Sequence, residues 1–169
     1  MPNGNEQAIF TDDLNNALGD GWTWLREHST YWRSTQQGLE IRVEPGNAGD
    51  VQNALLRPAP DRSQGTYAIE IDIFNHTHPI QQYEQAGITW YVDGKPVFKL
   101  VKELIDGGLF IIPGRKEMPT QSVRLRLIVT ADSWEAQYRP AGESEFQTAE
   151  TGELPAPNDD QVSIQCYNG

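Results

Sequence analysis

The 169-residue chain has a single cysteine, Cys166, so it cannot form an internal disulfide. None of its apolar runs is long enough to cross a bilayer, which excludes a transmembrane helix. Basic residues are also scarce, with 13 Lys and Arg against 24 Asp and Glu and a formal net charge of −11. Because phosphate binding needs a clustered basic surface, we expect neither a nucleic acid nor a membrane as partner.

The first ten residues, MPNGNEQAIF, lack the basic start and the apolar core of a secretory signal. We therefore expect a cytoplasmic location. No linker, internal repeat or low-complexity segment interrupts the chain, and its length suits one domain with one hydrophobic core. We expect residues 1–169 to form a single domain.

Helical periodicity is nearly absent, and alternation of apolar and polar residues with a period of two takes its place. Turn-forming residues separate the alternating segments, and Asp93-Gly94 is typical of a hairpin turn. About nine or ten short strands of this kind predict an all-β fold, a two-sheet antiparallel β-sandwich or jelly roll. The clearest segments are 39–43, 67–73, 86–92, 97–103, 109–112, 123–129, 134–139 and 162–167.

The alternation also assigns side chains to faces, because residues two apart in a strand share a face. Carboxylate, amide, ammonium and phenol groups fall opposite the apolar positions, and this combination suits carbohydrates, which offer hydroxyls and apolar ring faces. A solvated face with cross-strand ion pairs, each worth about 0.2–1 kcal/mol, is the other interpretation. If the strands are neighbours, one polar face carries Glu70, Asp72, Gln85, Tyr91, Lys99, Glu103, Arg124 and Arg126.

Tryptophans at alternate positions near the N-terminus need a separate interpretation. Such residues usually pack in a core or at its rim, and we predict packing for Trp22. Trp24, with Arg26 two residues later, could instead form a platform on which a sugar ring stacks. The role of Trp32 is open in the same way.

Several longer stretches resemble a known family. They are GWTWLREHSTYW (21–32), NALLR (53–57), YAIEIDIF (67–74), YEQAGITWYVDGKPVFKLVKE (83–103) and SWEAQYRPAGESEF (133–146). Together they resemble the concanavalin A-like family labelled regulation-of-enolase-like, and they are similar to the β-sandwich domain that accompanies family 43 β-xylosidases. The resemblance implies a concanavalin A-like jelly roll, a fold that lectins, glycan-binding modules and glycanases share. It also implies recurring polar positions at Glu84, Gln85, Lys99 and Glu103.

The stretch AIEIDIFNH is similar to the Glu-x-Asp-x-Glu signature of retaining glucanases on the same jelly roll. Glu70 and Asp72 match its first two acids, but the third position holds Phe74 or, with one extra residue, Asn75. Neither side chain can donate a proton, whereas retention needs two carboxyl groups about 5–5.5 Å apart. A glycoside hydrolase or polysaccharide lyase that combines Glu70 with a carboxylate from another strand, such as Glu103 or Glu84, stays open.

Metal sites are weakly indicated. His76 and His78 have same-face spacing, but Pro79 marks a loop, so a turn role is favoured over zinc. The acids in 12–13 and 158–160 are candidate calcium ligands without the spacing of a calcium loop. We expect no cofactor, and calcium is the ion to consider.

These patterns predict a non-catalytic jelly roll that binds a carbohydrate or small polyol on a concave polar face. A hydrolase or lyase is the first alternative. A cytosolic regulatory or protein-interaction module, which the acidic composition favours, is the second. The predicted ligand-binding residues are Trp24, Glu70, Asp72, Glu84, Gln85, Tyr91, Lys99 and Glu103.

Overall fold

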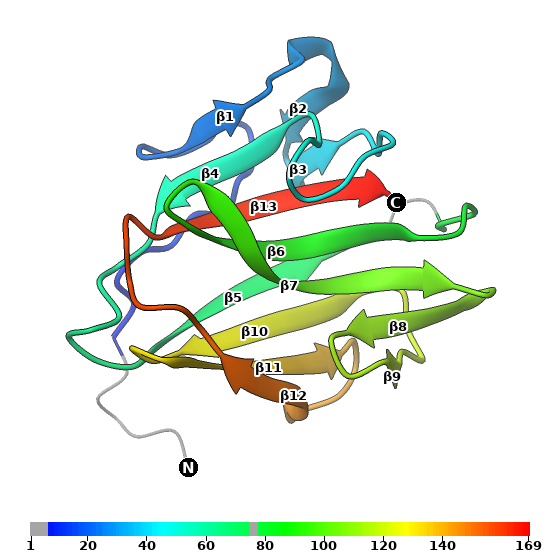
Figure 1. Cartoon of the computed structure of the whole chain (residues 1–169). Helices are drawn as coiled ribbons and strands as arrows, with labels where there is room; N and C mark the ends of the chain where they lie inside the picture. The colour runs from blue at the N-terminus through cyan, green and yellow to red at the C-terminus, as the bar shows by residue number, and fades with distance from the viewer. Residues whose placement is uncertain (1–6, 75–77) are drawn as a thin grey trace.

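The computed structural model describes residues 7–74 and 78–169 and shows an antiparallel β-sandwich (Figure 1). The seven-stranded sheet has the order β1 (Thr23–Leu25), β4 (Ala54–Pro58), β13 (Gln161–Asn168), β6 (Glu84–Val92), β7 (Lys95–Ile105), β8 (Gly108–Ile112), β9 (Lys116–Glu117). The four-stranded sheet has the order β12 (Gln147–Glu153), β11 (Ser133–Pro140), β10 (Val123–Val129), β5 (Tyr67–Ile73). The prediction of an all-β sandwich is confirmed.

Two smaller elements complete the fold. The one short 3-10 helix of the described chain, η1 (Ser29–Tyr31), precedes a separate hairpin of β2 (Trp32–Thr35) and β3 (Gly38–Ile41). Within the part of the chain that the structure describes, no helix is both long and apolar enough to cross a membrane.

The core lies between the two sheets and follows from the alternation along each strand. In β10 every second residue is buried, whereas Arg124 and Arg126 point away from the core. Each large aliphatic side chain buried in this way contributes about 1.5–3 kcal/mol. The buried layer comprises Ile88, Trp90, Val92, Leu100 and Ile111 from the larger sheet and Val123, Leu125, Leu127, Val129, Ala136 and Tyr138 from the smaller.

A buried ion pair links the two sheets at one end of the sandwich. The Nε of Arg62 lies 2.6 Å from Oδ2 of Asp160, and the two side chains are 0% and 6% exposed. The other guanidinium nitrogens donate to main-chain carbonyls of Thr130, Ala131 and Pro155. These carbonyls lie between β10 and β11 and after β12, whereas Asp160 directly precedes β13. The guanidinium therefore joins the ends of strands from both sheets.

Arg62→Met should lower the free energy of unfolding by about 3–5 kcal/mol, because Asp160 would remain buried without its partner. Urea unfolding followed by tryptophan fluorescence measures the change. Arg33→Met is the matched control: the Arg33–Glu40 distance is also 2.6 Å, but Arg33 is 74% exposed. The control should cost less than about 1 kcal/mol. Equal losses in the two variants would contradict a special role for the buried pair.

Candidate functional site

The structure divides the predicted polar face between two sheets. Because β5 pairs with β10 and β6 pairs with β7, the acids of β5 do not lie beside the polar residues of the β6–β7 hairpin. The prediction of one continuous polar face is therefore wrong. Glu70, Asp72, Arg124 and Arg126 lie on the outer face of the four-stranded sheet, and Gln85, Tyr91, Lys99 and Glu103 lie on the outer face of the seven-stranded sheet.

On the four-stranded sheet the polar side chains satisfy one another. Arg124 lies directly opposite Asp72 and donates two hydrogen bonds to its carboxylate, at 2.6 and 2.7 Å. These hydrogen bonds lower the pKa of Asp72. Arg126 is paired with Glu70 at 2.6 Å. Exposed pairs of this kind contribute about 0–1 kcal/mol, so this face is an ordinary solvated sheet surface.

The seven-stranded sheet carries a cluster of four polar side chains, which we call the polar cluster: Gln85, Lys99, Glu103 and Tyr167. Three of its members lie in one cross-strand row, with Tyr167 opposite Gln85 and Gln85 opposite Glu103. Nζ of Lys99 donates to Oε1 of Gln85 at 2.5 Å, and Nε2 of Gln85 donates to Oε1 of Glu103 at 3.1 Å. Nζ of Lys99 also lies 3.4 Å from the Tyr167 hydroxyl. A cation, an amide and a carboxylate thus form one hydrogen-bonded chain.

A glycine makes the diagonal contact between Lys99 and Gln85 possible. Lys99 lies opposite Thr89, so its side chain must cross the position of Gly87 to reach Gln85. A Cβ atom on Gly87 would lie 2.1 Å from the carbonyl oxygen of Leu100. Since no real Cβ tolerates such a contact, this point of the sheet surface carries no side chain, and the ammonium group can pass over it.

Burial sets the electrostatics of the polar cluster. Gln85, Glu103 and Tyr167 are 5%, 7% and 4% exposed. Loss of water raises the pKa of Glu103, and the charge of Lys99 opposes part of that rise. Burial raises the pKa of Tyr167 to about 12, with Glu103 contributing. The phenol is therefore protonated at neutral pH and keeps its O–H as a hydrogen-bond donor.

Tyr91 shares this face but is covered. Its hydroxyl donates to the carbonyl of Ala48 at 2.7 Å and lies 3.1 Å from Oε1 of Gln165. Oε1 of Gln165 also accepts from Ser163 at 2.9 Å. Because Tyr91 is only 2% exposed, its ring offers no surface on which a sugar could stack.

Two other predicted binding residues lie on the opposite face of the same sheet. Glu84 precedes Gln85 and therefore points the other way, and its carboxylate accepts a hydrogen bond from the main-chain N–H of Gln81 at 3.1 Å. Trp24 lies opposite the fully buried Leu55 of β4 and shares its face of the sheet. The ring centroids of Trp24 and Trp32 are 4.7 Å apart. These two side chains therefore do not share a face with Gln85, Lys99 and Glu103.

Sequence reasoning missed Tyr167, which closes one end of the polar cluster, and Gln165 beside it. A signal was present: Ser163, Gln165 and Tyr167 alternate with Val162, Ile164 and Cys166. In the structure these three polar residues line the outer face of β13, next to β6.

The candidate metal positions do not come together. In residues 7–74 and 78–169 the structure contains no group of three or more His, Cys, Asp or Glu side chains that could hold a metal ion. Asp12 instead accepts hydrogen bonds from Leu14, Gly19 and Trp22. Asp160 is bound to Arg62. His76 and Asn75 lie outside the described residues.

Comparison with known proteins places the fold but not the activity. No protein-family model matches the chain, and no curated protein matches it. The structure is similar to Bacteroides ovatus xyloglucan PUL GH43B, with 16% identity, a TM-score of 0.61, and coverage of 96% of this chain and 37% of that one. It is similar to the GH43 BlXynB protein from Bacillus licheniformis, with 17% identity, a TM-score of 0.69, and coverage of 94% and 35%. These likenesses show the fold.

Two further structures extend the comparison. A GH43_12 protein retrieved from a capybara gut metagenome shares 14% identity at a TM-score of 0.67, with coverage of 93% of this chain and 34% of that one. A functionally unknown protein from Saccharomyces cerevisiae shares 10% identity at a TM-score of 0.55, with coverage of 85% and 84%. The chain thus spans about a third of the three GH43 proteins. The likeness to a family 43 β-sandwich is confirmed at the level of fold, and the regulation-of-enolase label finds no support.

Glu103→Gln should raise the free energy of unfolding at pH 7. The folded-state pKa of Glu103 lies above its ordinary value of 4.5, so the folded chain holds its proton longer and loses stability as pH rises through that window. The glutamine variant escapes this loss, and its advantage should shrink below about pH 4.5.

Asp72→Asn provides the contrast, because the pKa of Asp72 is lowered and the sign reverses. This variant should be less stable than the parent at pH 7, and the difference should fade as pH falls through the carboxyl pKa. Urea unfolding at several pH values measures both variants. A Glu103→Gln variant that loses ground to the parent as pH rises would contradict the assignment.

Proposed function

We propose that the chain binds a carbohydrate or small polyol, without catalysis, at the polar cluster on the outer face of the seven-stranded sheet. The observation that carries this proposal is the hydrogen-bonded chain from the half-buried Lys99 through the buried Gln85 to the buried Glu103. Burying an amide and a carboxylate, and part of a cation, costs stability even when they are paired. A sheet face that needed only to be covered would be more stable with apolar residues.

The polar cluster has hydrogen-bonding capacity left over that suits adjacent hydroxyls. The ammonium of Lys99 has three N–H groups and two acceptors in the structure, Gln85 and Tyr167. The carboxylate of Glu103 accepts from Gln85 through one oxygen. A hydroxyl both donates and accepts, so neighbouring hydroxyls of one sugar can bind the ammonium and the carboxylate together.

An accessible aromatic side chain stands at one end of the same row. The half-buried Phe110 lies opposite Glu103 on β8, whereas the ring of Tyr167 at the other end is as buried as that of Tyr91. Sugar rings present apolar C–H faces that stack on aromatic rings. The likeness to three proteins named GH43 also supports a carbohydrate ligand for this fold.

The carboxylates favour binding over hydrolysis. Among the described residues, Glu103 is the sole carboxylate in the polar cluster, and Glu70 is engaged by Arg126 on the other sheet. The pair of Glu70 with Glu103 therefore cannot act on one glycosidic bond. The next acid on the row is the exposed Glu117, which lies opposite Phe110 on β9. The backbones of Glu103 and Glu117 are two strand spacings apart, about 10 Å. Hydrolysis with inversion, which uses carboxyls about 6.5–9.5 Å apart, is the second candidate function.

Titration calorimetry with a panel of mono- and oligosaccharides tests the proposal. Lys99→Met and Glu103→Gln should each weaken binding at least about tenfold, because a hydrogen bond to a charged group contributes about 1.5–3 kcal/mol. The matched controls are Arg126→Met and Glu70→Gln, the same changes on the four-stranded sheet, and they should bind like the parent.

Two outcomes would overturn the proposal. If no sugar of the panel binds the parent chain, the polar cluster is not a carbohydrate site. If the parent releases reducing ends from a polysaccharide panel and Glu117→Gln abolishes the release, the chain is a hydrolase that uses Glu103 and Glu117.

A further inference from the structure

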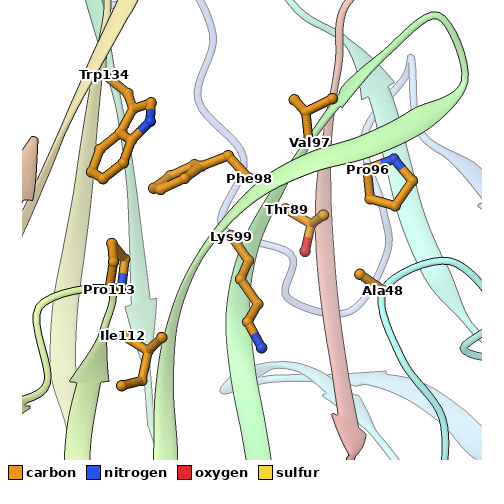
Figure 2. A pocket seen from close by; sticks show the side chains of 9 residues that line it. All are labelled: Ala48, Thr89, Pro96, Val97, Phe98, Lys99, Ile112, Pro113 and Trp134. Atoms are coloured by element: carbon orange, nitrogen blue, oxygen red, sulfur yellow. The ribbon is translucent and has the colours of Figure 1, made fainter. Parts of the chain in front are cut away.

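A cavity of about 370 Å³ adjoins the polar cluster and shares Lys99 with it (Figure 2). Its polar lining comes from Lys99 and Thr89, and most of the remaining wall is apolar. The apolar lining includes Val97, Ile112, Pro113 and Trp134. The cavity is broadly open to solvent, and its volume, apolar walls and few polar groups match those of small-molecule sites.

The cavity exists because β7 is longer than its neighbour. Strand β8 pairs only with Val101–Ile105, so residues 95–100 of β7 have a partner on one side alone. At the end of β8, Ile112 and Pro113 form one wall. Trp134 of β11 closes the other end by stacking on Phe98, with ring centroids 4.1 Å apart. The cavity therefore results from the difference in length between β7 and β8, and residues of both sheets line it.

Thr89 is the feature of this cavity that packing does not explain. The residue is 1% exposed, and its hydroxyl oxygen has no hydrogen-bond partner. Figure 2 shows this oxygen pointing into the gap between Lys99 and Ala48. Nε2 of Gln165, on the adjacent strand, also lacks a partner. Buried polar groups without partners are rare in native proteins, since each one costs stability.

We propose that the cavity is a second sugar subsite, so that the ligand is an oligosaccharide of at least two units. This inference rests on the proposed function, because the first unit is the one bound at the polar cluster. Lys99 contacts both units, since its ammonium belongs to the polar cluster and its side chain lines the cavity. The hydroxyl of Thr89 binds a hydroxyl of the second unit.

The walls of the cavity fit a sugar ring. Val97, Ile112 and Pro113 present aliphatic carbon to the space, which matches the C–H faces of a pyranose. The polar groups of the lining are those of Thr89 and Lys99, which lie opposite each other on β6 and β7 (Figure 2), and Lys99 also belongs to the polar cluster. A ligand that continues from the polar cluster therefore meets hydrogen-bonding groups first and an apolar wall beyond them.

Calorimetry with glucose, cellobiose and cellotriose, and with xylose, xylobiose and xylotriose, measures the number of units bound. In at least one series the dissociation constant should fall about tenfold from the monosaccharide to the disaccharide. Thr89→Val should weaken disaccharide binding about fivefold, an effect typical of one neutral hydrogen bond, and leave monosaccharide binding unchanged. Thr89→Ser, which keeps the hydroxyl, should bind like the parent.

A second pair of variants does not depend on the core. Val97→Trp should fill the cavity from its exposed rim and reduce disaccharide binding to the monosaccharide level. Val43→Trp is the matched control, because the two valines are 40% and 41% exposed and Val43 does not line the cavity. Equal affinity for mono- and disaccharides would overturn the second subsite and leave the proposed function standing. Absence of binding to every probe would overturn both.

Discussion

The ion pair of Arg62 and Asp160 is the interaction on which the arrangement of the strands depends. Asp160 accepts from Arg62 and also from Nε1 of Trp90, at 3.2 Å, so one carboxylate holds the start of β13 against the end of β6. That alignment places Tyr167 opposite Gln85, at the far end of the same two strands. A contact at one end of the sandwich therefore sets the geometry of the polar cluster at the other. Its removal would be felt in both sheets, because the guanidinium also holds the turn between β10 and β11.

The two outer faces of the sandwich show how similar residues acquire different roles. Acids and bases on the four-stranded sheet stand in direct cross-strand pairs, half exposed to water, and neutralise each other. On the seven-stranded sheet the charges are separated by an amide, and the carboxylate of Glu103 is largely withdrawn from solvent. Withdrawal from water strengthens each hydrogen bond of the polar cluster and makes any polar group left without a partner costly. Composition is therefore a poor guide to function, and burial is a better one.

The sequence predicted much of the local structure but less of the pairing. Alternation correctly sent Ile88, Trp90 and Leu100 inward and Gln85 and Lys99 outward, because that choice depends only on neighbours along the chain. It could not reveal that β5 joins β10, since the choice between two alternating partners is made by the whole sheet. Strand β12 shows no alternation of apolar and polar residues, because Ala149 alone of its residues is buried. Gly152 lies directly against the Trp134 ring, where a side chain would clash. Neither role can be predicted from the neighbouring residues in the sequence.

The amide of Gln85 gives the polar cluster a direction. Its oxygen must face the ammonium of Lys99 and its nitrogen the carboxylate of Glu103. The reverse orientation would place two donors together at Lys99 and two acceptors together at Glu103. The hydrogen-bonded chain thus offers N–H groups at its Lys99 end and carboxylate lone pairs at its Glu103 end. A chain molecule with distinct ends, laid along it, is not equivalent to the same molecule turned around. Under the proposed function, the polar cluster would therefore distinguish the two directions of a bound polymer.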